Sequence, residues 1–387
     1  MTSGPKTLFI SAGEVSGDHY TARIGTLLRE RGFEGKIYGL CGAESRDAGF
    51  EALWENERLH IMGITEVLSS LPDILSLMGE MYRNIMKNRP EAMVVADSPD
   101  FHLPLIRRLR HGGYRGKIFY ISPPAVWAWR KYRVADLIRN VDVCMPLFNF
   151  EHDYLVSRGC NSSWTGHPLV EEFNRDRQCE DEVCSRVRGT RRPKPGDSII
   201  ALLPGSRRSE IESLYPVLSE VASAVTDRGC CPVFSIAPGL SERAREYLMS
   251  NIERNSHSYY DGPGRDIMAV SEAVAGSSGT ATAQALLLRR YMIVMYKMKP
   301  LTALVGKMLL KGVYFAIPNL LAEEIFYPEL IQNNANAELA VQEICKWLDM
   351  DEYAKKNVIR RMDELVTLMG SPGVYDFWAD QIIGELK

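Results

Sequence analysis

Short apolar runs alternate with amphipathic stretches along the first part of the chain. Five runs have the length and composition of buried parallel strands: 7–11, 37–40, 93–96, 118–121 and 141–145. Between the first two runs, Ile24, Leu27 and Leu28 recur at helical spacing, and Asp18 is the expected N-cap of this helix. The alternation predicts a βαβ series around a parallel sheet.

A charged segment separates this series from a second one. Residues 174–197 are dense in charge and contain Pro193, Pro195 and Gly196 near their end, which favours a domain boundary. Further strand-like runs and the expected starts of helices follow: runs at 198–203, 232–236 and 292–295, and starts at Glu210, Ser241 and Thr282. Apolar stripes after Ala337 predict helices to the end of the chain.

The two series predict an α/β protein with two doubly wound halves. We place an N-terminal domain at 1–190, a second domain at 197–350 and C-terminal helices at 351–387. In such sheets ligands bind beyond the carboxyl ends of the strands, so the loops after the strand runs are where chemistry is expected.

Composition and charge exclude several classes of protein. The chain has 387 residues, 45% of them hydrophobic and 25% charged, with a formal net charge of −3, unlike a disordered, collagen or coiled-coil chain. This charge gives no global field for holding a nucleic-acid backbone. The 8 cysteines include no CxxC pair, and we interpret them as reduced thiols that bind no zinc. No stretch approaches the ~20 apolar residues of a membrane span, so we expect a cytoplasmic protein.

Two loops of the first half carry candidate chemistry. In GEVSGDHY, the small residues Gly13, Ser16 and Gly17 let a backbone approach a ligand, although Gly17 and Asp18 also suit a plain turn and cap. In ADSPDFHLP, Asp97 and Asp100 follow a strand, and one carboxylate could be the general base for a hydroxyl. We favour Asp97 as the base and a helix N-cap for Asp100.

The third loop of the first half, YISPPAVWAWR, is rich in aromatic residues. Arg130 is placed to meet a phosphate, while Trp127 and Trp129 serve either a ligand or the core. His167 in TGHPLVE is more typical of a structural histidine than of a catalyst, so we assign it no chemistry.

Two loops of the second half suit phosphate groups. In LLPGSRRSEI, the amides near Gly205 and Ser206 and the Arg207 guanidinium would make a diphosphate cradle, unless the segment is a plain turn with surface arginines. In AGSSGTATAQAL, a loop of small residues at 277–280 opens a helix and again suits an anion or a bare turn. Two such loops in one domain fit a nucleotide diphosphate.

The stretch 59–89 is dense in apolar residues with basic residues close behind. It could bury an acyl chain or contact a membrane, but its periodicity alone favours an ordinary core. The residues of this candidate acyl or membrane patch are Ile61, Met62, Ile64, Val67, Leu68, Leu71 and Leu75.

A set of motifs spread over nearly the whole chain carries a family resemblance. The motifs are GEVSGD (13–18), MGITEVL (62–68), DSPDF (97–101), SPPAVWAWR (122–130), GHPLVE (166–171), LPGSRRSEI (203–211), DGPGRDIM (261–268), SSGTAT (277–282), IPNLLA (317–322) and PELIQ (328–332). Together they resemble the lipid-A-disaccharide synthases, the family 19 glycosyltransferases. The resemblance implies a glycosyltransferase B fold, in which two Rossmann-like domains face a cleft and C-terminal helices cross back to the first.

The resemblance also implies an activity. The family transfers 2,3-diacylglucosamine with inversion from its UDP derivative to 2,3-diacylglucosamine 1-phosphate, giving a β-1,6 disaccharide and UDP without a metal or cofactor. It implies an acceptor- and lipid-binding first domain, a UDP-binding second domain, and a homodimer associated peripherally with the inner face of the inner membrane. The apolar patch would then face the lipid, which reverses the preference for core.

The residues that match the family motifs receive roles by position. Asp97 matches the proposed base, and Arg207 lies in a segment that contacts the departing diphosphate. Substrate contacts are expected at Gly13, Glu14, Ser16, Gly17, Asp18, Asp100, Trp127, Arg130, Ser206, Arg265, Ser278, Gly279, Thr280, Gln284, Asn319 and Gln332.

The chain departs from the family pattern at two places on the donor side. Gln284 stands where most relatives have a glutamate assigned to the ribose hydroxyls, and it has lost that charge. Glu323 and Glu324 follow PNLLA where many relatives have Gly-Arg-Glu, and carboxylates there would repel a diphosphate unless they point away. A related transferase with another UDP-sugar donor and a non-catalytic lipid or nucleotide binder are therefore the alternatives.

Overall fold

The computed structural model describes residues 6–59, 64–175, 180–194, 196–297 and 314–386, with the backbone alone at 64–70 and 174–175. The predicted patch residues Ile61 and Met62 lie outside these ranges. The contacts divide the chain into two compact units, Met1–Glu171 with Met369–Lys387 and Glu172–Leu368. The chain therefore passes from the first unit to the second between residues 171 and 172 and returns to the first between 368 and 369. The domain limits expected from the sequence were 190/197 and 350/351.

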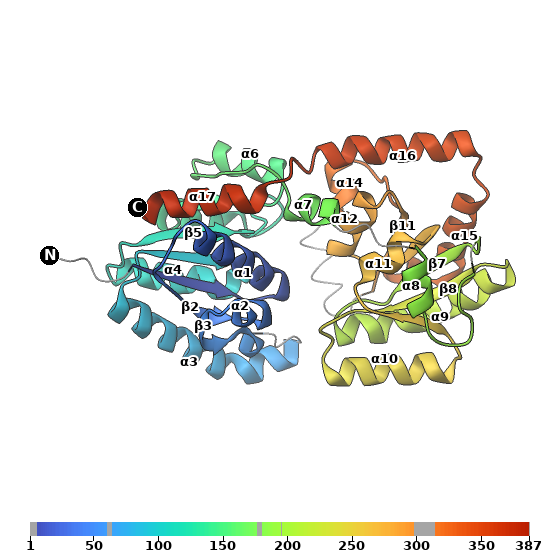
Figure 1. Cartoon of the computed structure of the whole chain (residues 1–387), viewed down its shortest axis with the longest axis horizontal. Helices are drawn as coiled ribbons and strands as arrows, with labels where there is room; N and C mark the ends of the chain where they lie inside the picture. Colours follow the sequence, from blue (N-terminus) through green and yellow to red (C-terminus); the bar gives the residue numbers. More distant parts are fainter. Residues whose placement is uncertain (1–5, 60–63, 176–179, 195, 298–313, 387) are drawn as a thin grey trace. The chain divides into compact units, whose positions relative to one another are not determined.

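The first unit is built on a parallel sheet with the strand order β3-β2-β1-β4-β5-β6 (Figure 1). Its strands are β1 (Thr7–Ala12), β2 (Lys36–Cys41), β3 (Glu51–Glu55), β4 (Ala92–Ala96), β5 (Lys117–Ile121) and β6 (Val143–Met145). Its helices are α1 (Val15–Glu30), α2 (Ala43–Asp47), α3 (Ile64–Asn88), α4 (Pro99–His111), α5 (Val134–Asn140), α6 (Asn149–Ser157) and α17 (Val374–Leu386), and α7 (Pro168–Arg175) spans the change to the second unit.

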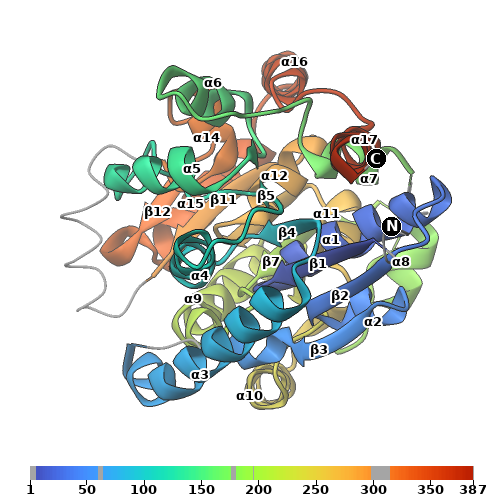
Figure 2. The same ribbon diagram turned by 90° about the vertical axis from the view of Figure 1, so that its left-hand side faces the viewer.

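Successive side chains along the strands of the first unit pack on opposite faces of its sheet. Leu8 and Ile10 of β1 pack in one buried cluster with residues of α1 and α17, whereas Phe9 packs in another with residues of α3 and α4. Figure 2 shows these helix pairs on opposite sides of the sheet. Successive strand side chains point to opposite faces, so a sheet covered on both sides needs nearly continuous apolar strands.

The second unit repeats the architecture with the strand order β12-β11-β10-β7-β8-β9. Its strands are β7 (Ile199–Leu203), β8 (Cys231–Ile236), β9 (Ser258–Asp261), β10 (Ala273–Ser277), β11 (Tyr291–Tyr296) and β12 (Glu329–Ile331). Its helices are α8 (Glu180–Arg186), α9 (Arg208–Asp227), α10 (Glu242–Arg254), α11 (Gly264–Ala269), α12 (Thr280–Leu287), α14 (Ile317–Ala322), α15 (Ala337–Leu348) and α16 (Glu352–Thr367).

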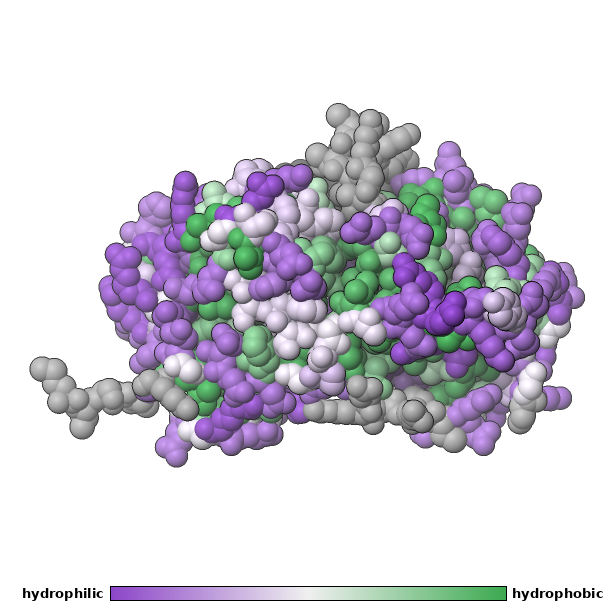
Figure 3. All heavy atoms as spheres, turned by 90° about the horizontal axis from the view of Figure 1, so that it is seen from above, coloured by the Kyte–Doolittle hydropathy of each residue, from purple (hydrophilic) through white to green (hydrophobic). Residues whose placement is uncertain are grey.

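The C-terminal helices divide between the units. In the first unit, α17 packs along α1, where Trp378 contacts Tyr20 edge to face at 5.8 Å and Arg31 binds Asp376 at 2.6 Å. In the second unit, α16 packs on α12 and α14, and its only buried residues are Met362 and Leu365. In the view of Figure 3, hydrophilic atoms surround smaller groups of hydrophobic ones.

The expected α/β class with two doubly wound sheets is confirmed, but some details of the sequence prediction were wrong. The helix after β1 begins at Val15, with Glu14 as its N-cap, so Asp18 does not cap it. Four strands were not predicted: β3, β9, β10 and β12. β10 reads AVAGS and looks like a loop of small residues, while β3 alternates exposed and half-buried positions at a sheet edge. None of the helices within the described ranges has the length and apolar character needed to cross a bilayer.

Candidate functional site

Asp97 lies at the point where the strand order of the first sheet reverses. Ala12 pairs with Ala96, so the chain leaves β1 and β4 side by side at Gly13 and Asp97. The Gly13 amide donates to Asp97 Oδ1 at 3.0 Å, and the Glu14 amide donates to Oδ2 at 3.2 Å. The carboxylate is therefore fixed at the crevice where doubly wound sheets bind their ligands.

The two glycines of the first loop fit closely against this carboxylate. A Cβ at Gly17 would lie 1.9 Å from Asp97 Oδ2, and one at Gly13 would lie 1.9 Å from Ser98 Oγ and 3.0 Å from Asp97 Oδ1. Only glycine leaves room for the carboxylate in this position. The structure thus brings Gly13, Glu14, Gly17 and Asp97 together. Ser16 is exposed on the first turn of α1.

The surroundings of Asp97 favour its protonated form. Burial raises the pKa of Asp97 to about 7, the negative charge of Glu14 acts in the same direction, and hydrogen bonds from Ser98 and from the Gly13 and Glu14 amides oppose them. A carboxyl group whose pKa lies near neutral pH combines a useful ionised fraction with appreciable basicity. These properties suit a general base.

Asp18, by contrast, has a structural role. Its carboxylate accepts from the Gly42, Glu44 and Ser45 amides at 2.8, 2.9 and 3.3 Å, and its side chain is buried. It therefore caps α2, and its hydrogen bonds tie that helix to α1. The predicted substrate contact at Asp18 stays untested, but its oxygens already have three amide partners.

Asp100 is exposed on the first turn of α4 and binds two arginines. The preference for Asp100 as the N-cap of this helix was wrong, because the N-cap is Ser98. Arg130 Nη1 lies 2.5 Å from Asp100 Oδ1, and Arg133 binds the same oxygen. The Arg130 guanidinium also lies 4.2 Å from the centre of the Trp129 ring. Two cations and one anion leave a local excess of positive charge next to the β4 loop, which suits a phosphate.

Trp127 is held by Glu151, a half-buried residue that was not predicted as part of the site. Its indole Nε1 donates to Glu151 Oε1 at 3.1 Å, and Glu151 Oε2 accepts from the Leu147 and Phe148 amides at 3.3 and 3.4 Å. Burial raises the pKa of Glu151 to about 7. Trp127 also packs edge to face on Phe150 at 5.1 Å, so this ring is partly structural.

In the second unit, the loop after β7 is closed by a side chain of its own helix. Glu210 Oε2 accepts from the Ser206 and Arg207 amides at 3.2 and 3.4 Å, and Arg207 Nη1 lies 3.6 Å from Glu210 Oε1. The expectation that the Ser206 amide is free for a diphosphate was wrong, because Glu210 caps the start of α9. The guanidinium of Arg207 is half-exposed.

The loop after β10 leaves the sheet beside the first one, because Leu203 pairs with Gly276. Gly279 has a φ of +118° and is exposed together with Thr280, while Ser278 Oγ donates to the Phe315 carbonyl at 2.5 Å. Within the described ranges, no acceptor is recorded for the Gly279 and Thr280 amides. These two amides open α12 and are the best-placed anion donors of this unit.

Asn319 holds the segment after α14 in place through hydrogen bonds of its side chain. Its side chain is fully buried, donates to the Tyr327 carbonyl and Glu329 Oε1 at 2.8 Å each, and accepts from the Phe326 and Tyr327 amides at 3.0 and 2.7 Å. These four bonds use its donors and lone pairs in full. The structure therefore gives the PNLLA motif an architectural role and leaves this amide little capacity for substrate.

Other predicted donor-side residues differ in their surroundings. Gln332 has a φ of +57° at the end of β12, and its Nε2 is buried without a partner among the described residues. Arg265 lies over the Phe173 ring at 5.9 Å, and Gln284 is half-buried on α12. Glu324 is paired with Arg361 of α16 at 3.5 Å, so its charge is partly neutralised.

The predicted apolar patch is only partly described. Leu71 and Leu75 of α3 are 46% and 56% exposed, which is unusual for large aliphatic side chains, whereas Leu77 on the same helix is buried. Ile64, Val67 and Leu68 belong to α3, but their side chains lie outside the description.

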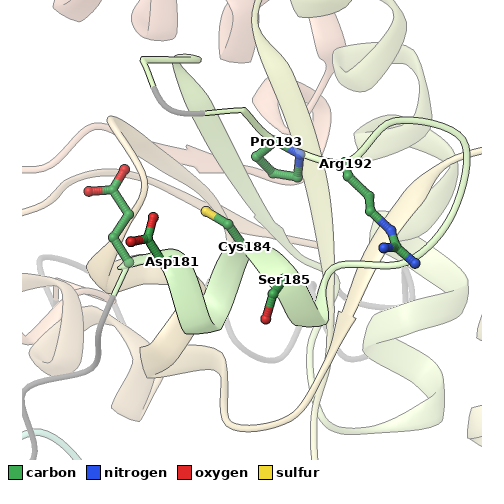
Figure 4. Close-up of a pocket in the computed structure, with 6 residues that line it drawn as sticks. Asp181, Cys184, Ser185, Arg192 and Pro193 are labelled. Carbon is green, nitrogen blue, oxygen red and sulfur yellow. The ribbon is translucent and has the colours of Figure 1, made fainter.

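One surface cavity lies apart from these loops. It has a volume of about 220 Å³ and is lined by residues of α8 and of the segment before β7 (Figure 4). Its lining residues are Glu180, Asp181, Cys184, Ser185, Arg192 and Pro193. None of the predicted site residues lines it, and no group of three metal-ligating side chains occurs in the part of the chain that the structure describes.

Comparison with known proteins decides the family. A family model described as lipid-A-disaccharide synthetase matches residues 8–369. The chain belongs to the lipid-A-disaccharide synthase family. A member from Alcanivorax borkumensis is 33% identical over 350 residues, which cover 89% of this chain and 88% of the relative. A member from Anaeromyxobacter dehalogenans is 32% identical over 398 residues, covering 98% and 97%.

Solved structures show the fold of this family member. A UDP-GlcNAc 2-epimerase from Neisseria meningitidis bound to UDP-GlcNAc matches with a TM-score of 0.62 and 10% identity, covering 98% of this chain and 100% of the other. The calicheamicin glycosyltransferase CalG4 matches with a TM-score of 0.59 and 11% identity, covering 99% of each. The resemblance stated from the motifs and the glycosyltransferase B class are thereby confirmed.

Proposed function

We propose that this chain is an inverting glycosyltransferase that moves 2,3-diacylglucosamine from its UDP derivative to 2,3-diacylglucosamine 1-phosphate. The products are the β-1,6 disaccharide and UDP. Membership of the lipid-A-disaccharide synthase family supports the reaction class. The observation that carries the proposal is the half-buried Asp97 carboxylate, held by two amides at the strand switch point of the first unit.

In the proposed reaction, Asp97 takes the proton from the 6′-hydroxyl of the acceptor as its oxygen forms the new bond to the anomeric carbon. The bond between that carbon and the β-phosphate oxygen breaks, and its electron pair leaves with UDP. Arg207 and the Gly279 and Thr280 amides would stabilise the growing negative charge on the diphosphate.

The acceptor itself would be recognised through its phosphate and its acyl chains. Arg130 and Arg133 hold an excess of positive charge around Asp100, which supports a phosphate contact. The exposed Leu71 and Leu75 support an apolar surface on α3 that reaches the lipid at the inner face of the inner membrane. We also propose a homodimer, to be tested by light scattering after size-exclusion chromatography.

The remaining donor-side and acceptor-side positions keep their proposed substrate roles as a group. They are Glu14, Ser16, Trp127, Ser206, Arg265, Ser278, Gln284 and Gln332. Asp18 and Asn319 would support these contacts through the backbone that they hold.

The proposal is tested by measuring UDP release in detergent with both acylated sugars, with each sugar alone and with neither. Release that requires both sugars is expected. Release from the donor alone would indicate hydrolysis, and no release with both would contradict the proposal.

A second candidate keeps the chemistry and changes the donor. Gln284 favours it, because a neutral amide replaces the carboxylate expected for the ribose hydroxyls. A binding screen across UDP-sugars separates the two, since a preference for an unacylated sugar nucleotide selects the altered donor. Calorimetric binding of UDP together with zero turnover of every pair would instead select a non-catalytic binder.

A further inference from the structure

The backbone that carries Asp97 is in an unusual conformation. Asp97 and Ser98 have φ values of +53° and +41°, two successive residues in a region that side-chain-bearing residues rarely adopt. The turn connects β4 to α4 and directs the Asp97 carboxylate to the Gly13 and Glu14 amides. Such a turn persists only where surrounding groups hold it.

Two buried side chains hold the Asp97 carbonyl. His102 Nδ1 lies 2.8 Å from this oxygen, and the Tyr120 hydroxyl donates to it at 2.7 Å. Both side chains are fully buried, one on α4 and the other on β5. The carbonyl therefore has donors for both of its lone pairs, from two different elements.

The protonation of His102 follows from its partners. A carbonyl oxygen only accepts, so Nδ1 carries the proton, and the bare Nε2 accepts from the buried Ser11 hydroxyl at 2.8 Å. Burial also lowers the pKa of His102 to about 4, so the ring is neutral at physiological pH. Ser11 belongs to β1, two residues before Gly13, so the ring links both strands of the switch point.

We propose that His102 is a positioning residue that, together with Ser11 and Tyr120, holds the Asp97 turn and thereby aims the catalytic carboxylate. This inference rests on the proposed role of Asp97 as base. His102 touches neither substrate nor reacting atoms, so its effect passes through the Asp97 main chain. What the turn requires is a proton donor at the position of Nδ1, so another side chain with a donor there should replace the ring.

Four substitutions separate positioning from packing. His102→Leu removes both ring hydrogen bonds, while His102→Asn keeps an N–H donor close to the position of Nδ1. His257→Leu is the matched control, because His257 Nε2 makes the same kind of bond to Ser219 Oγ at 2.8 Å in the second unit. Tyr120→Phe removes only the hydroxyl donor to the same carbonyl and serves if His102→Leu does not fold.

The expected results concern kcat more than KM. His102→Leu lowers kcat about tenfold to a hundredfold with both KM values near wild type, because a misplacement of about 1 Å has that effect on a catalytic group. His102→Asn recovers most of the loss, Tyr120→Phe loses severalfold, and His257→Leu stays near wild type. In an Asp97→Asn background, His102→Leu causes no further loss.

Any of three results would overturn the proposal. The kcat of His102→Leu could fall no further than that of His257→Leu, or a folded His102→Asn variant could recover none of the lost kcat. His102→Leu could also lower kcat in the Asp97→Asn background as much as it does in the wild-type chain. If the wild-type chain releases no UDP, the proposed function fails, and hydrogen exchange still tests the positioning. The Gly13 and Glu14 amides should then exchange faster in His102→Leu, but not in His257→Leu. Unchanged exchange in His102→Leu would contradict the inference.

Discussion

Gly17→Ala is the change that separates the catalytic geometry from the stability of the fold. The new Cβ would lie 1.9 Å from Asp97 Oδ2, so the carboxylate oxygen must move by about 1.5 Å to reach an ordinary contact of 3.4 Å. The carboxylate is the end of a side chain and can rotate, whereas Gly17 lies in α1, where alanine is favoured by about 1 kcal/mol. The fold therefore accommodates the change, but the displaced carboxylate loses its hydrogen bonds to the Gly13 and Glu14 amides.

The expected loss is about a hundredfold in kcat, the effect of moving a reacting group by roughly 1 Å. The free energy of unfolding should stay within about 1 kcal/mol of wild type, since the helical gain offsets the local adjustment. UDP release under saturating substrates measures the first quantity, and urea denaturation measures the second.

Gly79→Ala is the matched control for this experiment. Gly79 is also helical and belongs to the same unit, but a Cβ there meets nothing within 4 Å. It should leave kcat unchanged and stabilise the protein slightly. A Gly17→Ala variant whose kcat lies within twofold of wild type would refute the reasoning that the position of the Asp97 carboxylate governs the rate.

Three further predictions concern the donor site, the fold and the pH profile. Arg207→Ala should weaken UDP binding in calorimetry about tenfold to a hundredfold, whereas Arg208→Ala, which removes an exposed pair with Glu212, should change it less than twofold; equal effects would count against a specific role for Arg207. Asn319→Ala should lower the free energy of unfolding in urea by about 2–4 kcal/mol, because it leaves buried partners unpaired, whereas the exposed Asn334→Ala should change it little. A base with a pKa of about 7 is protonated below that value, so kcat/KM should rise with pH up to about 7 and then level off. Glu14→Gln removes a charge that raises the pKa of Asp97, so this limb should move to lower pH, and a shift to higher pH would contradict the assignment.

The fold and the first half of the candidate site could be predicted from the sequence because both depend on local patterns. Nearly continuous apolar runs predict buried parallel strands, and the ends of such strands meet at one edge of the sheet. Gly13 and Asp97 were both expected in loops after strands, and the structure shows that these two loops are in contact. The strand β10 was missed because its residues are small and its burial comes from neighbours in the sheet.

The hydrogen-bond partners could not be predicted, because they depend on three-dimensional contacts between distant residues. Asp18 looks like the cap of its own helix, yet it caps α2, which begins 25 residues later. Asn319 looks like a ligand contact in its motif, but its bonds to Tyr327 and Glu329 are visible only in the structure. The role of Glu210 could have been predicted from the sequence, since a glutamate at the third position of a helix commonly accepts from the amide of the N-cap residue.

The most direct test of the central claim is the formation of the disaccharide itself by the wild-type chain and by Asp97→Asn, followed by mass spectrometry with both acylated sugars supplied. Asp97→Asn keeps the size of the side chain but cannot take a proton, so product formation should fall by about 10²–10⁴-fold while calorimetric binding of UDP stays unchanged. Wild-type turnover together with a fully active Asp97→Asn variant would show that another group is the base, and the absence of disaccharide from the wild-type reaction would contradict the proposed transfer.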